Sequence, residues 1–399
     1  MKSNYEPLGK HIRLVDYRNS EEVTSTVLGI SIDKEFMPSV ANVIGTDLSR
    51  YKLISKGLFA CNPMHVGRDE RLPIALYEKD SPAIVSPAYF MFEIIDRDVL
   101  NEEYLMMWFR RPEFDRECWF MTDGSVRGGI TWDDLCRIQL PVPPYERQLD
   151  VVESYRAITR RIAMKKEIND NLAKTIKAVF KSWFLDFDAF DGVELVQSQY
   201  GLIPNGWHYE LLGNLCDCVT KGTTPTTLGK DFTDTGINFI KGESINDDHS
   251  FNKTLFAHID DETDELLKRS RIYVNDIVFT IAGTLGKFAL VDSSVIPANT
   301  NQAVAIIRTS KIMPAMLYSY FIGEWQVEFY KRNTQQAVQA NLSLGTIKDL
   351  PILLPDSKGQ DHYMQLVTPL IVGMQNNFSE IERLYELQNQ LLARLSSSR

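Results

Sequence analysis

The 399-residue sequence has few of the side chains that build active sites and metal centres. Its 5 cysteines and 6 histidines are scattered, and no second cysteine or histidine pair stands at zinc-site spacing from Cys216 and Cys218. We therefore expect reduced thiols and no metal site. The sequence also shows no glycine-rich cofactor loop and no nucleophile–base pair. These absences argue against catalysis by this chain.

Two short segments come close to known motifs, and each lacks the residue that carries the chemistry. Val142-Pro-Pro-Tyr145 resembles the Asn/Asp-Pro-Pro-Tyr motif of amino-methyltransferases without its amide or carboxylate. Gly283-Thr-Leu-Gly-Lys287 lacks phosphate-loop spacing, and Phe288 stands where Ser or Thr is needed. We interpret the first segment as a helix entry and the second as a turn.

The sequence also lacks a transmembrane-length apolar run, a signal peptide and an excess of basic residues. We therefore expect a soluble, cytoplasmic protein without a membrane partner. The net charge of −10 counts against DNA binding, for which a basic domain is the usual footprint. When the chain is divided at residues 144, 189 and 355, only the segment 145–189 carries a net positive charge, with 9 basic and 7 acidic side chains.

A stretch from Glu146 to Phe187 contains neither glycine nor proline and repeats apolar residues every three or four positions. This spacing predicts a helix with a narrow apolar stripe, of the kind that forms a coiled-coil seam, with Ile168 among its members. A second stripe at the C-terminus supplies the expected partner. The residues expected to pair the two helices are Tyr155, Ile158, Ile162, Leu172, Val179, Val367, Leu370, Met374, Leu384 and Leu391.

The two stripes align without a gap at an offset of 212 residues, so that Tyr155 matches Val367 and Leu172 matches Leu384. The same offset continues backwards through Gln148/Gln360 and Pro143/Pro355. The chain is therefore predicted to be a tandem repeat. Pro369 and Gly373 interrupt the start of the second helix, which we expect to kink or to begin late.

The pattern predicts an α+β fold in which two globular mixed α/β domains, residues 1–144 and 190–355, are separated by two long helices. These helices are expected at residues 145–189 and 356–399, paired as an antiparallel coiled coil with pseudo-twofold symmetry. Short β-like runs such as Val27–Ile32 and Ile84–Ile95 support the mixed class for the first domain, as does a short helix at Asn101–Arg110.

The sequence resembles the specificity subunits of type I restriction–modification systems over essentially its whole length. The resemblance is carried by Pro143-Pro-Tyr-Glu-Arg-Gln148 before the first long helix and by Ile203-Pro-Asn-Gly-Trp207 at the start of the second half. Ser86-Pro-Ala-Tyr89 and its counterpart Asn301-Gln-Ala303 add to it. The second helix entry, Asp356-Ser-Lys-Gly-Gln360, departs from the Pro-Pro-x-Glu-x-Gln form.

The resemblance implies that each globular domain is a target recognition domain reading one half of a split sequence in double-stranded DNA. It implies that the helices dock two methyltransferase subunits, and that motor-nuclease subunits complete the assembly. S-adenosylmethionine, ATP and magnesium are then expected on the partner subunits, and none on this chain, which is expected to be non-catalytic.

Loop residues that can meet phosphates or base edges are the candidates for DNA contact. In the first domain these are Asn62, His65, Arg68, Arg71, Tyr89 and Arg127. In the second domain they are Lys221, Thr223, Thr224, Lys241, Lys287, Asn301, Gln302, Gln335, Gln336 and Asn341.

Two alternatives to DNA recognition remain open from the sequence. The chain could be a coiled-coil adaptor that never contacts DNA, which its acidic charge favours. It could also be a free-standing DNA methyltransferase or nuclease, against which the missing cofactor and catalytic motifs count. DNA binding that depends on salt would remove the first alternative, and failure to bind cofactor would remove the second.

Overall fold

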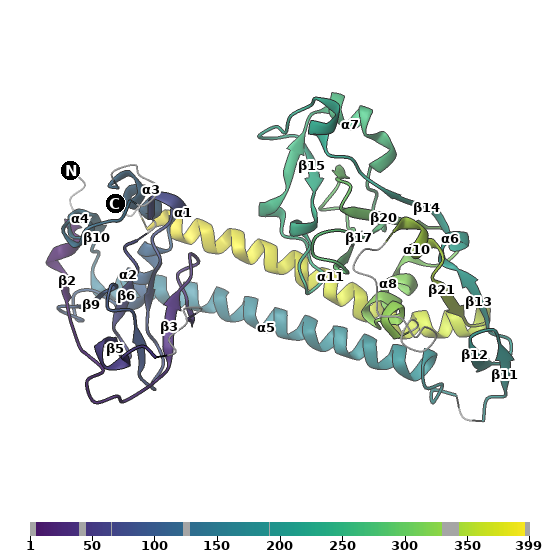
Figure 1. Cartoon of the computed structure of the whole chain (residues 1–399), viewed down its shortest axis with the longest axis horizontal. Helices are drawn as coiled ribbons and strands as arrows, with labels where there is room; N and C mark the ends of the chain where they lie inside the picture. Colours follow the sequence, from purple (N-terminus) through teal and green to yellow (C-terminus); the bar gives the residue numbers. More distant parts are fainter. Residues whose placement is uncertain are drawn as a thin grey trace. The chain divides into compact units, whose positions relative to one another are not determined.

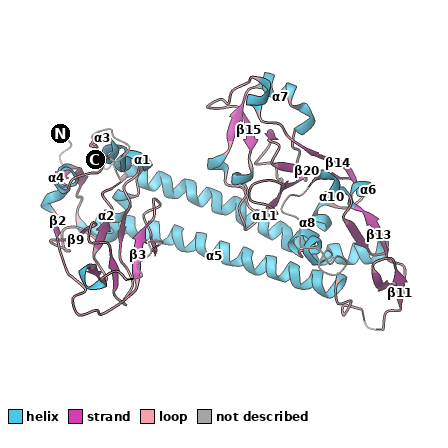
Figure 2. Cartoon of the chain, in the orientation of Figure 1, coloured by secondary structure: helices cyan, strands magenta, loops and turns pink. Residues whose placement is uncertain are grey.

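The computed structural model describes residues 5–39, 45–64, 66–122, 128–190, 192–328 and 343–395 as a mixed arrangement of helices and strands (Figures 1 and 2). The chain divides into two compact units. Unit 1 comprises Met1–Ile162 and Arg383–Arg399, and unit 2 comprises Ala163–Glu382. Each unit therefore holds one globular region together with segments of the two long helices, α5 (Tyr145–Phe184) and α11 (Ser357–Arg394).

The globular region of unit 1 contains two four-stranded sheets. The first has the order β2-β9-β6-β7 and is antiparallel, and the second has the order β4-β3-β8-β5 with β3 parallel to β8. Strand β1 pairs with β10 and closes the region. The strands are β1 (Tyr5–Pro7), β2 (Ile12–Leu14), β3 (Val27–Ile30), β4 (Phe36–Pro38), β5 (Lys52–Ile54), β6 (Phe59–Cys61), β7 (Ile74–Leu76), β8 (Ala83–Val85), β9 (Phe90–Ile94) and β10 (Gln139–Pro141). The short helices are α1 (Val66–Asp69), α2 (Glu102–Phe109), α3 (Pro112–Phe120) and α4 (Trp132–Arg137).

The first sheet of unit 1 has a hydrophobic core on each face, as β6 shows. Phe59 and Cys61 belong to a core shared with α2, whereas Ala60 between them belongs to a core shared with the second sheet. Successive side chains of a strand point to opposite faces, so the sheet is a middle layer between helices and a second sheet. Helix α2 is capped by Asn101, whose side-chain oxygen accepts from the amides of Glu103 and Tyr104 at 3.0 and 3.1 Å.

The globular region of unit 2 has the same two kinds of sheet. Its antiparallel sheet has the order β14-β20-β17-β18, and a second sheet has the order β16-β15-β19 with β15 parallel to β19. Strand β13 pairs with β21, as β1 does with β10. The strands are β11 (Leu195–Ser198), β12 (Gly201–Pro204), β13 (His208–Leu211), β14 (Cys216–Lys221), β15 (Ile237–Ile240), β16 (Ala257–Ile259), β17 (Ile277–Thr280), β18 (Phe288–Leu290), β19 (Ala298–Thr300), β20 (Val304–Thr309) and β21 (Pro351–Leu354). The short helices are α6 (Leu212–Leu215), α7 (Asp261–Leu266), α8 (Pro314–Ile322) and α10 (Leu344–Lys348).

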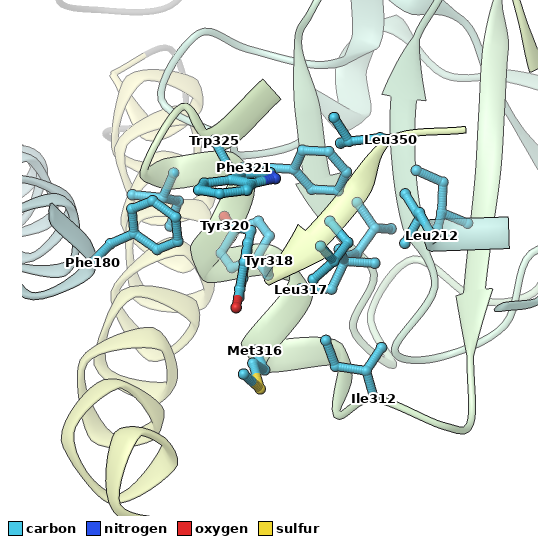
Figure 3. Close-up of a cluster of buried hydrophobic side chains, with 14 of the residues drawn as sticks. Phe180, Leu212, Ile312, Met316, Leu317, Tyr318, Tyr320, Phe321, Trp325 and Leu350 are labelled. Atoms are coloured by element: carbon cyan, nitrogen blue, oxygen red, sulfur yellow. The ribbon is translucent and has the colours of Figure 1, made fainter. Parts of the chain in front are cut away.

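Aromatic side chains join α5 to the core of unit 2 (Figure 3). The ring of Phe180 on α5 lies 4.9 Å from that of Tyr320 on α8, measured between centroids. Trp325 donates from Nε1 to the carbonyl oxygen of Pro351 at 2.7 Å, and the Tyr320 hydroxyl donates to that of Leu353. A Cβ atom at Gly323 would overlap the Phe180 ring, so this close packing requires glycine there.

The first turn of each long helix contains a glutamine that donates to the carbonyl oxygen of a preceding proline. Gln148, which is fully buried, donates from Nε2 to the carbonyl oxygens of Pro143 at 2.8 Å and Val99 at 2.9 Å. Gln360 donates from Nε2 to the carbonyl oxygen of Pro355 at 2.9 Å. A glutamine at this position therefore ties the first turn of each helix to the extended segment that precedes it.

Within each unit the segments of α5 and α11 run in opposite directions. In unit 2 the Lys165 Nζ atom lies 2.8 Å from a carboxylate oxygen of Glu380, and Asn169 donates to the carbonyl oxygen of Met374 at 3.3 Å. In unit 1 Gln388 donates to the Thr159 hydroxyl at 2.8 Å, and Val152 shares a core with Leu392 and Leu395. Residue numbers thus rise along one helix as they fall along the other.

None of the ten residues expected to pair the helices is exposed. Ile162, Val367, Met374 and Leu384 are buried, and Tyr155, Ile158, Leu172, Val179, Leu370 and Leu391 are half-buried. The apolar stripe predicted for α5 is wrong at Ile168, which was not among these ten residues. Ile168 is 39% exposed, whereas the neighbouring Asn169 is only 4% exposed. Asn169 tolerates burial because its side-chain oxygen accepts a hydrogen bond from the side-chain Nδ2 atom of Asn377 at 2.7 Å.

The expectation that the second long helix begins late is also wrong, since α11 begins at Ser357 and continues through Pro369. Asp356 caps its first turn, because its Oδ1 atom accepts from the Gly359 amide at 2.9 Å. Pro369 and Gln365 are both exposed. The Gln365 carbonyl, which receives no helical N–H from the proline, thus belongs to the exposed side of the helix.

Candidate nucleic-acid interface

In unit 2 the carboxyl ends of four strands meet at one edge of the globular region. Strands β14 and β17 both run antiparallel to β20, and they end with Lys221 beside Ala305 and Thr280 beside Val304. Strands β15 and β19 are parallel to each other, and β19 leads directly into β20. The loops that follow these strands therefore gather where β20 begins. We call this edge the unit 2 edge.

Hydrogen bonds connect the loops of the unit 2 edge. The Gly222 amide donates to the carbonyl oxygen of Asn301 at 3.1 Å, and the Thr224 hydroxyl lies 2.5 Å from the Gln302 Oε1 atom. The Thr300 hydroxyl donates to the carbonyl oxygen of Ile240 at 2.7 Å. The sequence candidates Lys221, Thr223, Thr224, Asn301 and Gln302 are thereby brought together from segments that lie far apart in the chain.

Three lysines of the unit 2 edge differ in their surroundings. Lys221 is exposed at the end of β14. The Lys241 ammonium lies 4.7 Å from the centroid of the Phe232 ring, where the ring face attracts a cation. The Lys287 ammonium lies 3.0 Å from a carboxylate oxygen of Asp247 and its side chain is 21% exposed. A phosphate that binds Lys287 must therefore compete with Asp247.

A half-buried histidine, which the sequence did not distinguish from the other dispersed histidines, packs on the residue that follows Lys287. The His249 ring stacks on Phe288 with 4.1 Å between centroids. Burial lowers the pKa of His249, while Asp248 and Asp247 act in the opposite direction. Its Nδ1 atom and the Tyr318 hydroxyl have no hydrogen-bond partner within the described part of the chain. Only the fold brings these groups together, so the sequence carried no signal for them.

In unit 1 the equivalent edge lies at the carboxyl ends of β3 and β6, and we call it the unit 1 edge. Asn62 follows β6 and Tyr89 precedes β9, and these two strands pair at Cys61 and Phe90. The half-buried Tyr89 ring packs against the core shared by the two sheets, and burial raises the pKa of its hydroxyl. Tyr89 is therefore partly a core residue as well as a candidate contact.

Two of the candidate arginines of unit 1, Arg68 and Arg71, are paired with carboxylates. Arg68 binds both carboxylate oxygens of Asp69, at 2.6 and 2.9 Å. Arg71 lies 3.3 Å from an oxygen of Asp33 and both side chains are exposed. Such exposed pairs are weak, so DNA can exchange for the carboxylate. The candidates His65, Arg127, Gln335, Gln336 and Asn341 lie outside the described residues.

A pocket of about 440 Å³ lies elsewhere in unit 1, between α2, α5 and the turn that follows β3. None of the described DNA-contact candidates lines it. Across the described ranges, no group of three or more His, Cys, Asp and Glu side chains is placed to hold a metal ion. No helix in the described part of the chain has both the length and the apolar character for crossing a membrane.

Three known proteins are similar to this chain, two in sequence and one in fold. The type I restriction enzyme MjaIX specificity subunit of Methanocaldococcus jannaschii is 23% identical over 308 residues, which cover 76% of this chain and 70% of that protein. The HindI specificity subunit of Haemophilus influenzae is 22% identical over 454 residues, which cover 96% and 95%. The solved S subunit of a type I restriction–modification system from M. genitalium shares the fold, with a TM-score of 0.52 and 14% identity over 98% of this chain and 95% of that one.

The family model described as the type I restriction modification DNA specificity domain matches residues 204–382, which lie within unit 2. This match covers the unit 2 edge and most of α11. Residues 204–382 therefore belong to the family of type I restriction modification DNA specificity domains, and the chain as a whole is similar to the specificity subunits of type I restriction enzymes.

Proposed function

We propose that this chain is the DNA-recognition subunit of a type I restriction–modification complex, in which each unit reads one half of a split target. One observation carries the proposal: the two units have matching sheets and matching helix entries, but different side chains at the edges where their strands end. A recognition domain that was duplicated to bind two different half-sites is expected to keep its buried residues and to vary the loops that contact DNA.

The duplication is supported by where equivalent elements begin. Helix α2 begins at Glu102 and α8 at Pro314, and α5 begins at Tyr145 and α11 at Ser357, so both separations are 212 residues. Thr131 caps α4 by accepting from the amide of Asp134, and Ser343 caps α10 by accepting from that of Thr346. We propose that the chain is a pseudo-twofold tandem repeat, with recognition domains at residues 1–144 and 190–355 and helices at 145–189 and 356–399.

We further propose that α5 and α11 form one antiparallel coiled coil that separates the two recognition domains and docks two methyltransferase subunits. Support comes from large apolar side chains that remain exposed on these helices, each by more than two-fifths: Leu149, Met164, Leu366, Val372 and Leu387. Exposed apolar groups of this kind suit a protein partner. Motor-nuclease subunits would complete the complex.

In this account the partner subunits carry the chemistry. The chain would bind neither S-adenosylmethionine nor ATP and magnesium, which would belong to the methyltransferase and motor subunits. With a net charge of −10 the chain attracts DNA poorly, so basic surfaces of the partners would supply much of the affinity. Lys221, Lys241, Lys287 and the polar residues around them would then contribute selectivity.

The test compares the purified chain with its complex with methyltransferase subunits. We expect the chain alone to bind DNA weakly and the complex to bind one sequence tightly and to methylate it. Binding of S-adenosylmethionine by the isolated chain would support the methyltransferase alternative instead. A complex that methylates DNA while this chain forms no cross-link to DNA would support the adaptor alternative, which the acidic charge favours.

A further inference from the structure

Trp119 and Phe120, at the carboxyl end of α3, form an exposed aromatic pair in unit 1. Trp119 is 43% exposed and Phe120 is 85% exposed. Large apolar side chains usually gain free energy by burial, so a phenylalanine this exposed points to a binding surface. Arg116, whose side chain is 72% exposed, shares the same face of α3 because it lies three and four residues before them.

Two buried residues of α3 fix this pair at the unit 1 edge. Asp115 Oδ1 accepts from the Lys34 ammonium at 2.6 Å and from the Leu72 amide at 3.0 Å. Lys34 follows β3, and Leu72 precedes β7, which pairs with the end of β6. Cys118 shares a core with Cys61, the last residue of β6. Burial raises the pKa of the Cys118 thiol, and the nearby Cys61 raises that pKa further. The end of α3 therefore lies beside the carboxyl ends of β3 and β6.

The second repeat carries a different chemistry at the same alignment position. At the offset of 212 residues, Trp119 and Phe120 align with Lys331 and Arg332 in the sequence. Two copies of one methyltransferase subunit would require matching surfaces on the two repeats. Two different DNA half-sites, in contrast, require different surfaces on the two repeats. A cationic pair in one repeat and an aromatic pair in the other therefore fit DNA better than a shared protein partner.

We propose that Trp119 and Phe120 form an apolar wedge that stacks against bases of the half-site read by unit 1. The proposal rests on the proposed function and adds a mode of recognition to it. Aromatic side chains of DNA-binding proteins insert at base steps and partly unstack them, and the cost depends on the sequence being deformed. The wedge thus contributes selectivity through DNA deformability, which hydrogen-bonding loop residues do not supply.

The test uses the full chain in complex with methyltransferase subunits and a duplex that contains its mapped target. We expect the double variant W119A/F120A to bind this duplex about 5- to 100-fold more weakly, as loss of base–aromatic stacking predicts. The dependence of affinity on salt should stay unchanged, because no phosphate contact is removed. Phe120→Tyr keeps an aromatic ring and should retain most of the affinity.

The control is Val99→Ala, which removes an apolar side chain of similar exposure, 42%, beyond the opposite end of β9. It should bind like the unaltered chain. Equal binding by W119A/F120A and the unaltered chain would overturn the wedge while leaving the proposed function intact. Loss of methyltransferase association in W119A/F120A would overturn it in favour of a protein-docking surface. An unaltered complex without sequence-specific binding would instead overturn the proposed function itself, and the wedge with it.

Discussion

Gly222 is the residue that lets two loops of the unit 2 edge approach each other. A Cβ atom there would overlap the carbonyl oxygen of Thr300, a backbone atom that cannot move aside alone. We expect Gly222→Ala to destabilise unit 2 by about 1–3 kcal/mol, the range for overpacking a tight site. Thermal unfolding of the full chain measures this effect.

Gly242→Ala is the matched control for that substitution, because a Cβ atom at Gly242 would lie 3.6 Å from the Thr280 methyl group, an ordinary contact. The control should change stability by less than about 0.5 kcal/mol, as most substitutions away from special features do. Equal melting temperatures for both variants would show that the loops tolerate a side chain at Gly222.

His249 should make stability depend on pH. Burial lowers the pKa of the folded-state imidazole below its ordinary value of 6.5, against the opposing effects of Asp248, the Phe288 backbone and Asp247. Below about pH 6.5 the unfolded chain then binds a proton that the folded chain resists, so stability falls as pH falls. His249→Asn tolerates the positive φ of 69° and cannot titrate. Between pH 7.5 and 5.5 we expect the melting temperature of the unaltered chain to fall more than that of the His249→Asn variant. Parallel pH profiles would refute this role for His249.

At the scale of elements, the pairing of α5 with α11 in unit 2 includes a buried polar network. Asn377 donates to Asn169 at 2.7 Å, and the Lys165 ammonium donates to Asn377 Oδ1 at 2.9 Å. We expect Asn169→Leu to destabilise the chain by about 1–3 kcal/mol, because Asn377 then loses its acceptor in a buried position. The double variant N169L/N377L should recover most of this loss, since removing both partners leaves neither amide unsatisfied.

Asn171→Leu makes the same change at an exposed position of α5, and Asn376→Leu does so on α11. Neither control should shift the unfolding midpoint in denaturant appreciably. If the double variant were as unstable as Asn169→Leu alone, the two asparagines would not act as a pair.

The helices also show which features of an element could be predicted from the sequence. Period and offset predicted where α5 and α11 lie, because a seam requires apolar residues at regular spacing. Apolar spacing placed Ile168 in the seam and left Asn169 out, because spacing carries no sign that an amide is satisfied by a residue 208 positions away. A late start of the second helix was expected from Pro369, but α11 begins at Ser357, because a helix can continue through a proline where the unpaired carbonyl is accessible to water.

For the whole molecule, the mixed fold class was predictable because turn signals, short β-like runs and two long helical patterns recur in order. The interface was less predictable. Lys221, Gln302 and Thr224 were proposed as separate loop residues, and only the pairing of β14 and β17 with β20 brings their loops to one edge. The exposure of Trp119 and Phe120 depends on how α3 is anchored through Asp115, a contact between residues remote in sequence.

The most direct test of divided DNA recognition is a genome-wide map of methylated bases in cells that express this chain with its methyltransferase subunits. We predict a split target for the unaltered chain. For Gln302→Ala, which alters the unit 2 edge alone, we predict that base preference relaxes in one half of the target and stays unchanged in the other. A continuous target, or a substitution that alters both halves equally, would contradict the division of DNA reading between the two units.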